Sequence, residues 1–571
     1  MPSRSLPTIT AADVAGNAER AGIVLTADRA AAIAATANRR VAAFRPAQAT
    51  LTFDDVPALA SARFAAQALP ASGTPLPVVE TPTADHAEHA MTLVQAVEAL
   101  RSGATTSVQL TQAAIARAEA HQETFNAFVR IDADAALAQA ARCDEARARG
   151  EATGPLHGVP LAHKDMFHRA GQVSTCGSKL RRDWVAGTTA GVLQRLDAAG
   201  ALQVGTLHMT EFAYGPTGQN AWLGDARNPW NREHLTGGSS SGSAVSVASG
   251  MVFGALGSDT GGSVRMPAAL CGVTGMKTTP GLVSRAGCMP LSHTLDTIGP
   301  LTRTVQDNAL MLSVIAGFDA ADPASIDATR LPGVDLDFVA AAERGRVQGL
   351  EGVRIGLPRG YFDRGLSPEV AGLVDAAAQV LRERGATLVP VDMPDLDAVN
   401  AAGNLITWAE AVALHAPWMR ERAGEYGAQT RGRIESSLAA SSQDYLDAKR
   451  HAGRALAAFV ASVFGACDVL LAPALAFAVP RLDQVDVSGG DAMLHILDEI
   501  TRLTRPANVL GLPALALPCG FTGGGASTAP TLPCGMQLIG RPFAESLLLQ
   551  VGAGYQAATD WHRRLPAGVA V

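Results

Sequence analysis

The chain has 571 residues, of which 47% are hydrophobic and 17% charged, and 46 basic against 53 acidic residues give a net charge of −7. This composition excludes a disordered chain and supplies enough apolar residues for a sizeable core. Nucleic acids and anionic membranes attract clustered Lys and Arg, and here the basic residues are scattered, so we expect neither as a partner. Only four of the basic residues are lysines: Lys164, Lys179, Lys277 and Lys449.

The first 90 residues predict a helical segment followed by a linker. Residues 8–65 are rich in alanine with helical spacing and almost no strand signal. The stretch Leu69–Pro82 contains four prolines and predicts an extended connection. We therefore expect a helical segment over residues 1–68, a linker over 69–90 and one large domain over 91–571.

The large domain begins with helical patterns and then alternates short apolar runs with further helices. The predicted helices are Leu93–Leu100 (ending at Gly103), Ser107–Ala120 (capped by Ser107), Ala133–Arg149, Ala190–Ala199, Val370–Glu383, 400–465 and Ala544–Ala558. The predicted strands are Val159–Ala162, Leu202–Val204, Val353–Leu357, Thr387–Val391, Val469–Ala472, Ala514–Pro518 and Met536–Ile539. This alternation is typical of an α/β fold, and we predict a mixed β-sheet core covered by helices.

Glycine and serine are most concentrated between Thr236 and Ser263. A flexible linker would not carry apolar residues at core spacing, as this stretch does at Val245, Val247 and Leu256. Glycines at this density let the backbone turn tightly and present N–H groups to one point. A phosphate-binding loop would need GxxxxGK[ST] or GxGxxG, and neither occurs in this stretch.

Two arrangements of a serine nucleophile remain. Gly238 to Gly242 matches the G-x-S-x-G pattern of a nucleophile elbow with Ser240 at its centre, although the preceding NPWNREHLT is turn-like where an elbow needs a strand. In the other arrangement, Ser239 and Ser263 lie 24 residues apart, each after a Gly-Gly pair, and act together with a lysine.

The second arrangement resembles a known family. The segments GGSSSGSA and SDTGGSVRMPAALCGVTGMK are similar to the signature of the amidase signature family, and GVPLAHKDMF (Gly158–Phe167) is similar to its lysine motif. The resemblance continues through Val204–Asn231 and through LDTIGPLTRTV, DVLLAPA, NVLGLPALALPCG and GMQLIGRPF. It covers about residues 91–560 and implies the amidase signature fold and amide hydrolysis.

The resemblance also implies roles for individual residues. Ser263 would be the acyl-forming nucleophile, Ser239 a proton relay that follows a cis peptide bond, and Lys164 the base. A serine hydroxyl is a weak nucleophile unless a base takes its proton. Lys164 can do this only when neutral, and burial beside the apolar run before it would lower its pKa. The family-matched oxyanion hole consists of the backbone N–H groups of Thr260, Gly261, Gly262 and Ser263.

Other polar residues near these motifs are expected to have structural roles. Asp259 and Arg265 flank the nucleophile and would brace its loop, and Lys277 would support the core. Cys271 and Cys288 lie in no motif that suggests a nucleophile, and both are expected to be small core residues.

Histidines are weaker candidates for the chemistry. His163 is an alternative base, but it would point away from Lys164 because neighbours along a strand face opposite sides. His86 and His89 lie in the predicted linker with no carboxylate or cysteine at ligand spacing, so we expect no metal site and no cofactor.

We expect the substrate to be a small or medium carboxamide, with aryl amides, carbamates and urea-like compounds included. Substrate choice is expected to depend on residues 285–295 and 400–460 and on Met209, Tyr214 and Gly238. No charged anchor for an acidic substrate is evident from the sequence. The alternative is the A-type subunit of a glutamine-dependent tRNA amidotransferase, and the N-terminal segment and the net charge of −7 argue against it.

Cysteine usage and the N-terminus suggest a cellular location. The seven cysteines are odd in number and widely spaced without a CxxC pair, which is typical of reduced thiols. No signal peptide and no apolar run of membrane-spanning length is evident. We predict a cytoplasmic enzyme whose partner is a small amide, with a homodimer as an option and the N-terminal segment as a packing or dimerisation arm.

Overall fold

The computed structural model describes residues 8–52, 55, 57, 90–151, 154–488, 490–523 and 531–569. In these residues one sheet of eleven strands has the order β1-β3-β2-β4-β6-β5-β10-β11-β9-β7-β8. The strands are β1 (Phe128–Ile131), β2 (Pro160–Lys164), β3 (Leu202–Leu207), β4 (Gly254–Asp259), β5 (Thr274–Lys277), β6 (Thr297–Thr302), β7 (Arg354–Arg359), β8 (Thr387–Asp392), β9 (Val469–Pro473), β10 (Ala514–Thr522) and β11 (Leu532–Gly540). The predicted mixed sheet is confirmed, because β2 pairs in parallel with β3 and β4, whereas β10 pairs antiparallel with β5 and β11.

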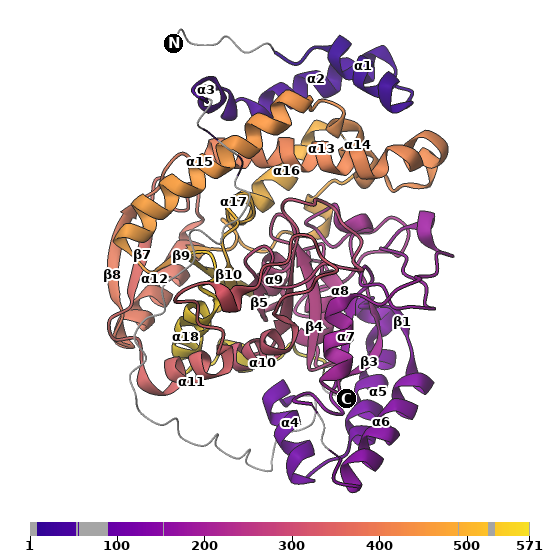
Figure 1. The fold of residues 1–571 in the computed structure, drawn as a ribbon, viewed down its shortest axis with the longest axis vertical. Coiled ribbons are helices and arrows are strands. Elements are labelled where there is room, and N and C mark those ends of the chain that lie inside the picture. Colours follow the sequence, from indigo (N-terminus) through magenta and orange to yellow (C-terminus); the bar gives the residue numbers. More distant parts are fainter. Residues whose placement is uncertain are drawn as a thin grey trace.

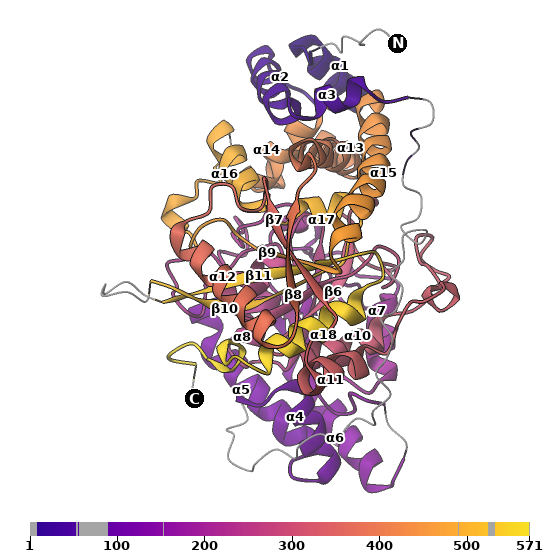
Figure 2. The ribbon, with the colours of Figure 1, turned by 90° about the vertical axis from the view of Figure 1, so that its left-hand side faces the viewer.

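Helices surround this sheet (Figures 1 and 2). They are α1 (Ala11–Ala21), α2 (Ala27–Val41), α3 (Phe44–Ala49), α4 (Leu93–Ser102), α5 (Ser107–Phe125), α6 (Ala133–Ala148), α7 (Gly191–Ala198), α8 (Ser241–Ala248), α9 (Arg265–Cys271), α10 (Val305–Ile315), α11 (Phe338–Gln348), α12 (Pro368–Glu383), α13 (Leu396–Arg422), α14 (Ala428–Ser437), α15 (Ser442–Ala466), α16 (Asp491–Thr501), α17 (Arg505–Val509) and α18 (Glu545–Gln556). In both views α4 to α6 lie at one end of the molecule, and α13 to α16 lie at the other end under α1 to α3.

Local sequence signals set several helix boundaries. Thr92 and Thr106 cap α4 and α5, each with a glutamine three residues later that completes a capping box. The cap of α5 is therefore Thr106, and the expected cap, Ser107, is its first residue. Gly103 ends α4 in the left-handed conformation, as predicted from its lack of a side chain.

The N-terminal helices pack on the helical end of the large domain. α2 contacts α13 and α14, and α3 contacts α13 and α15. Three ion pairs of these helices support this packing: Arg29 with Glu435 at 2.8 Å, Arg40 with Asp498 at 2.7 Å, and Arg45 with Asp444 at 2.6 Å. The expected boundaries at residues 68 and 90 stay predictions, because almost all of the linker lies outside the described residues.

In the part of the chain that the structure describes, the helices do not combine the length and the hydropathy that a bilayer requires. Within the described ranges, none is both long and apolar enough to cross a membrane.

Candidate active site

Lys164 lies at the carboxyl end of β2, beside the end of β4. These two strands are parallel neighbours, with His163 opposite Leu256 in the register, so their carboxyl ends meet at the same edge of the sheet. The Lys164 Nζ donates to Ser239 Oγ at 2.7 Å and to Ser258 Oγ at 2.8 Å. The side chain is buried, and each of its two hydroxyl partners comes from a segment at least 75 residues away along the chain.

Burial determines the protonation of this lysine. Desolvation lowers the pKa of Lys164 from 10.5 to about 7, and the more distant carboxylates of Asp296 and Asp259 offset only part of that effect. A substantial fraction of Lys164 is therefore neutral near pH 7. The partner Ser258 had no role in the sequence interpretation, since its contact depends on how β4 lies against β2.

Ser239 lies in the turn that precedes α8. The peptide bond between Gly238 and Ser239 is cis. A side chain at Gly238 would lie 2.7 Å from Gly218 N and 2.8 Å from Thr210 Oγ1, so only glycine can be accommodated there. The close approach required of Gly238 thus explains one of the glycines in the signature.

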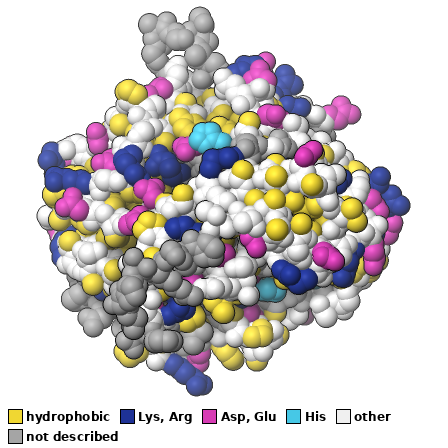
Figure 3. Space-filling view, turned by 90° about the horizontal axis from the view of Figure 1, so that it is seen from above, with side chains coloured by type: hydrophobic (Ala, Val, Ile, Leu, Met, Phe, Trp, Pro, Cys, Tyr) yellow, Lys and Arg dark blue, Asp and Glu magenta, His cyan; other side chains and the backbone are white. Residues whose placement is uncertain are grey.

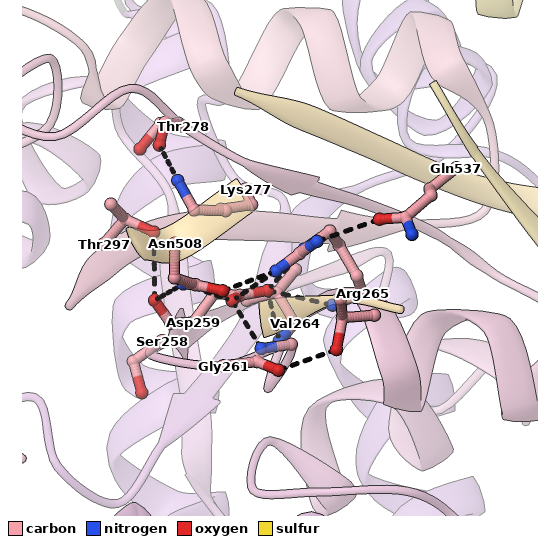
Figure 4. A network of polar contacts seen from close by, with 12 residues as sticks. Ser258, Asp259, Gly261, Val264, Arg265, Lys277, Thr278, Thr297, Asn508 and Gln537 are labelled. Atoms are coloured by element: carbon pink, nitrogen blue, oxygen red, sulfur yellow. Dashed lines mark hydrogen bonds and ion pairs between the residues drawn. The ribbon is translucent and has the colours of Figure 1, made fainter. Parts of the chain in front are cut away.

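Ser263 lies in the loop between β4 and α9, which is built around Asp259. The Asp259 carboxylate accepts hydrogen bonds from the N–H groups of Gly262 at 2.8 Å, Val264 at 3.2 Å and Arg265 at 3.3 Å. The Arg265 Nε also donates to this carboxylate at 3.0 Å, and both side chains are completely buried. Figure 4 shows Arg265 and Asn508 converging on Asp259.

The charge of Asp259 is maintained by its partners. Burial alone would raise its pKa, but Arg265, its hydrogen bonds and Lys277 hold the pKa well below its usual range. A permanently ionised carboxylate with several N–H donors fixes the loop that carries Ser263. The expected bracing role of Asp259 and Arg265 matches these contacts.

The four predicted oxyanion donors differ in their surroundings. The N–H of Gly262 is engaged by Asp259, as described above. No described residue accepts a hydrogen bond from the N–H groups of Gly261 or Ser263. The Thr260 side chain donates to Asp296 Oδ1 at 2.5 Å. The loop therefore leaves at least two amides, those of Gly261 and Ser263, available beside the Ser263 hydroxyl.

A small cavity of about 40 Å³ opens beside Ser263. It is lined by Ala213, Tyr214, Gly215, Pro216, Thr260, Gly261, Ser263, Leu291, Asn404, Thr407, Trp408, Arg433, Thr501 and Arg505. Of the expected substrate residues, Tyr214 is in its wall. The side chain of Met209 is fully buried in the core and does not line the cavity. Arg433 of α14 lies within the expected specificity segment 400–460, although it was not named, whereas Arg505 of α17 lies outside both expected segments.

The expected specificity segments are joined to each other and to the nucleophile loop. Asp296 accepts from Thr260 and also from the N–H groups of Leu291 at 2.8 Å and Ser292 at 3.0 Å. Glu410 of α13 binds the hydroxyl of Ser292 and the N–H of Thr294, the latter at 3.0 Å. Residues 291–296 and α13 thus form one connected wall.

The competing nucleophile and base occupy structural positions. The Ser240 hydroxyl donates to Ser258 O and accepts from Ser258 N, both at 3.3 Å, and no strand of the described chain leads directly into it, which disfavours the elbow. His163 accepts from Leu256 N at 3.3 Å on the opposite side of β2 from Lys164, and burial lowers its pKa to about 3.

The remaining candidates lie away from the reacting groups. Lys277 Nζ donates to the backbone oxygens of Thr278 and Leu512, both at 2.9 Å. Burial raises the pKa of the Cys271 and Cys288 thiols above the usual range, so neither is activated as a thiolate. His86 and His89 lie outside the described residues.

Comparison with known proteins agrees with this geometry. The family model described as Amidase matches residues 109–549. The chain belongs to the amidase signature family. It is an enzyme of the class that acts on carbon–nitrogen bonds.

Relatives within the family carry different names. The A-type subunit of the glutamyl-tRNA(Gln) amidotransferase of Roseiflexus sp. is 40% identical over 84% of this chain and 98% of its own length. A solved structure from a vestigial protein complex, which concerns the evolutionary origins of an s-triazine catabolic enzyme, has a TM-score of 0.74 at 34% identity, covering 82% of this chain and 98% of that one. A bacterial aryl acylamidase has a TM-score of 0.73 at 27% identity, covering 84% and 99%.

These relatives correct the expected set of partners. The predicted partners were a small amide and a second copy of the chain, and nucleic acid was excluded. This set was too narrow. The exclusion of nucleic acid was wrong, because a relative that is 40% identical belongs to an enzyme named for a tRNA. Net charge is a sum over the whole chain, and one component of an assembly need not itself carry the basic surface. On the face shown in Figure 3, basic and acidic side chains are interspersed.

Proposed function

We propose that this chain cleaves the C–N bond of a carboxamide by acyl transfer through Ser263, with Ser239 as the proton relay and Lys164 as the base. The observation that carries the proposal is the 2.7 Å hydrogen bond between Lys164 Nζ and Ser239 Oγ in a fully buried site where the pKa of the lysine falls to about 7. A neutral amine beside a hydroxyl can accept its proton, which a lysine with an ordinary pKa could not do at neutral pH.

The proton follows one path in each direction. As the Ser263 oxygen attacks the carbonyl carbon, its proton passes to Ser239, and the Ser239 proton passes to Lys164. The amides of Gly261 and Ser263 stabilise the negative oxygen of the tetrahedral intermediate, a contribution of about 100- to 1000-fold in rate for one such donor. When the C–N bond breaks, the same path returns a proton to the leaving nitrogen. Water then attacks the acyl-enzyme, and the path operates once more.

The names of the curated relatives favour glutamine as the substrate. In the amidotransferase role, this chain would release ammonia from glutamine for a partner protein, and tRNA would be a ligand of the assembly. Relatives of that name are 37% to 40% identical over 83% to 84% of the chain, so they support this alternative more directly than they support a hydrolase of small amides.

A second candidate is hydrolysis of a small carboxamide, carbamate or urea-like compound by the chain alone. Two observations favour it. The cavity beside Ser263 is small, about 40 Å³, and the structure is similar to that of an aryl acylamidase.

We also retain the prediction of a cytoplasmic enzyme, which is supported by the fact that all seven cysteines are free.

Ammonia release by the purified full-length chain tests the proposal. The panel comprises glutamine, simple amides, a carbamate and a urea-like compound, and Ser263→Ala is the matched inactive variant. Turnover restricted to glutamine supports the amidotransferase role, and turnover of small amides by the chain alone supports the hydrolase role. The mechanism is wrong if Ser263→Ala retains the wild-type rate while Ser240→Ala is inactive and folded.

A further inference from the structure

The N-terminal helix α2 reaches the wall of the cavity beside Ser263, which we call the inner cavity. The guanidinium of Arg40 donates to Asn404 Oδ1 at 3.2 Å, and its carbon lies 5.0 Å from the centroid of the Trp408 ring. Both Asn404 and Trp408 line the inner cavity. Arg40 thus contacts two residues of this wall, although it lies outside residues 109–549, the part of the chain that the family model matches.

Arg40 is also linked to a third wall residue through a carboxylate. It binds Asp498 of α16 with two hydrogen bonds of 2.7 Å, and the same carboxylate accepts from Arg505 at 3.3 Å. Arg505 lines the inner cavity. The side chain of Arg40 is only 8% exposed, so water competes little for these bonds. A bidentate pair of this kind fixes the geometry of both partners.

A second cavity, which we call the outer cavity, shares Asn404 and Arg505 with the inner cavity. Its wall comes mainly from α2, α13 and α16, which lie together near the top of Figure 1, and α2 supplies Thr36, Arg39 and Arg40. The outer cavity has a volume of about 690 Å³, within the range of roughly 300–1,000 Å³ for small-molecule sites. The inner cavity, at about 40 Å³, has room for little beyond the scissile amide.

The outer cavity is polar. Among the described residues of its wall are four arginines and three carboxylates, and its apolar side chains are three alanines and one leucine. Asn400 belongs to the same wall, and its Oδ1 atom is buried without a hydrogen-bond partner in the described part of the chain. An unpaired buried acceptor is unfavourable, and an N–H donor of a ligand would satisfy it. This wall therefore suits a polar group with an N–H donor better than an alkyl chain.

From these contacts we infer that α2 completes the substrate site. The outer cavity holds the part of the amide that extends beyond the inner cavity, and Arg40 is a positioning residue that holds Asn404 and Arg505 where the two cavities meet. The inference rests on the proposed function, because the extension is defined relative to the carbonyl carbon that Ser263 attacks. In this role α2 takes part in substrate selection, whereas the sequence predicted a packing or dimerisation arm.

Amides with and without an extension test the inference. N-acetylglycinamide and hexanamide have the same number of non-hydrogen atoms, but only the former carries a second amide group, and acetamide has no extension. For the wild type we expect kcat/KM to be highest for N-acetylglycinamide. In Arg40→Met, this kcat/KM should fall by about 10- to 100-fold, because a small misplacement of a positioning contact has effects of this size. The value for acetamide should change by less than about threefold. Released ammonia or glycinamide shows whether the extension is on the acyl or the leaving side.

Arg45→Met is the matched control in the same segment. Arg45 of α3 pairs with Asp444 at 2.6 Å and belongs to neither cavity wall as the structure describes them. Its loss should lower stability but leave the preference for N-acetylglycinamide over acetamide intact. Arg40→Lys keeps a cation near Asp498 without the forked geometry of arginine, so it should restore only part of that preference. Equal effects of Arg40→Met on both amides, or the same lost preference in Arg45→Met, would overturn the inference while leaving acyl transfer standing.

Binding separates this inference from the proposed chemistry. Calorimetry with Ser263→Ala should detect N-acetylglycinamide, and its affinity should fall at least about tenfold in the double variant with Arg40→Met. If the wild type cleaves no amide but this difference in affinity is found, the role of α2 stands and the proposed function fails. If Ser263→Ala does not bind N-acetylglycinamide, or binds it equally well with and without Arg40, the inference is wrong.

Discussion

Replacement of Lys164 by arginine isolates the property that the mechanism requires. Burial lowers the pKa of Lys164 from 10.5 to about 7, a change that corresponds to roughly 5 kcal/mol between its two protonation states. With a pKa of about 7, about 9% of the side chain is neutral at pH 6 and about 91% at pH 8. A rate limited by chemistry should therefore rise about tenfold between these two values and reach a plateau above pH 8.

Arginine keeps the positive charge and much of the length of lysine, but it cannot give up its proton in a protein. Lys164→Arg should therefore lose about 100- to 10,000-fold in kcat, the usual contribution of a general base, and should be nearly as damaging as Lys164→Ala. The assay is ammonia release from the best substrate between pH 5.5 and 9, with circular dichroism to confirm that each variant is folded.

Two other buried groups could produce a pH dependence in the same range. Burial lowers the pKa of Lys277 to about 7 and raises that of Asp165 to about 6. Lys277→Met and Asp165→Asn serve as controls, and the folded fraction of each should keep the rising limb near pH 7. A wild-type profile that is flat from pH 6 to 9 under chemistry-limited conditions, or a Lys164→Arg enzyme of normal activity, would refute a lysine base.

Three further substitutions test how the site is supported. Asp259→Asn leaves the guanidinium of Arg265 buried without its counter-charge, so the free energy of unfolding should fall by about 3–5 kcal/mol. Thermal unfolding measures this change, and an unchanged melting temperature contradicts the bracing role. Gly262→Ala places a Cβ 2.3 Å from Thr504 Oγ1 at a φ of +126°. The loop that carries Ser263 must then move, so kcat should fall by at least about tenfold. A normal kcat argues against a fixed loop. Arg40→Ala removes the ion pair between α2 and α16, so the free energy of unfolding measured in urea should fall by about 1–3 kcal/mol. No change in this free energy would mean that the N-terminal helices pack without the ion pair.

The sequence predicted most elements that have strong local patterns. The strand Val469–Ala472 was expected and β9 runs from Val469 to Pro473, because a short apolar run is typical of a buried strand. Helix α12 ends at Glu383 as predicted. By contrast β4, GALGSD, was missed, since it contains two glycines and no alternation of apolar and polar residues. It forms a strand because β2 and β6 pair with it on both sides.

The family and its motifs follow from the sequence by itself, because the signature residues that turn the backbone or take part in the reaction lie in short continuous segments of the chain. Which groups meet around Ser263 was decided only by the tertiary structure. Arg433 lies 170 residues from Ser263 along the chain. Arg40 lies 368 residues before Trp408, yet its guanidinium carbon is 5.0 Å from the centroid of that ring.

Periodicity along a sequence reports which face of an element is buried. It does not report which distant element covers that face, because that depends on how eleven strands and the helices around them pack together. The second partner of Lys164, the two arginines in the wall of the cavity and the docking of the N-terminal helices all depend on that packing.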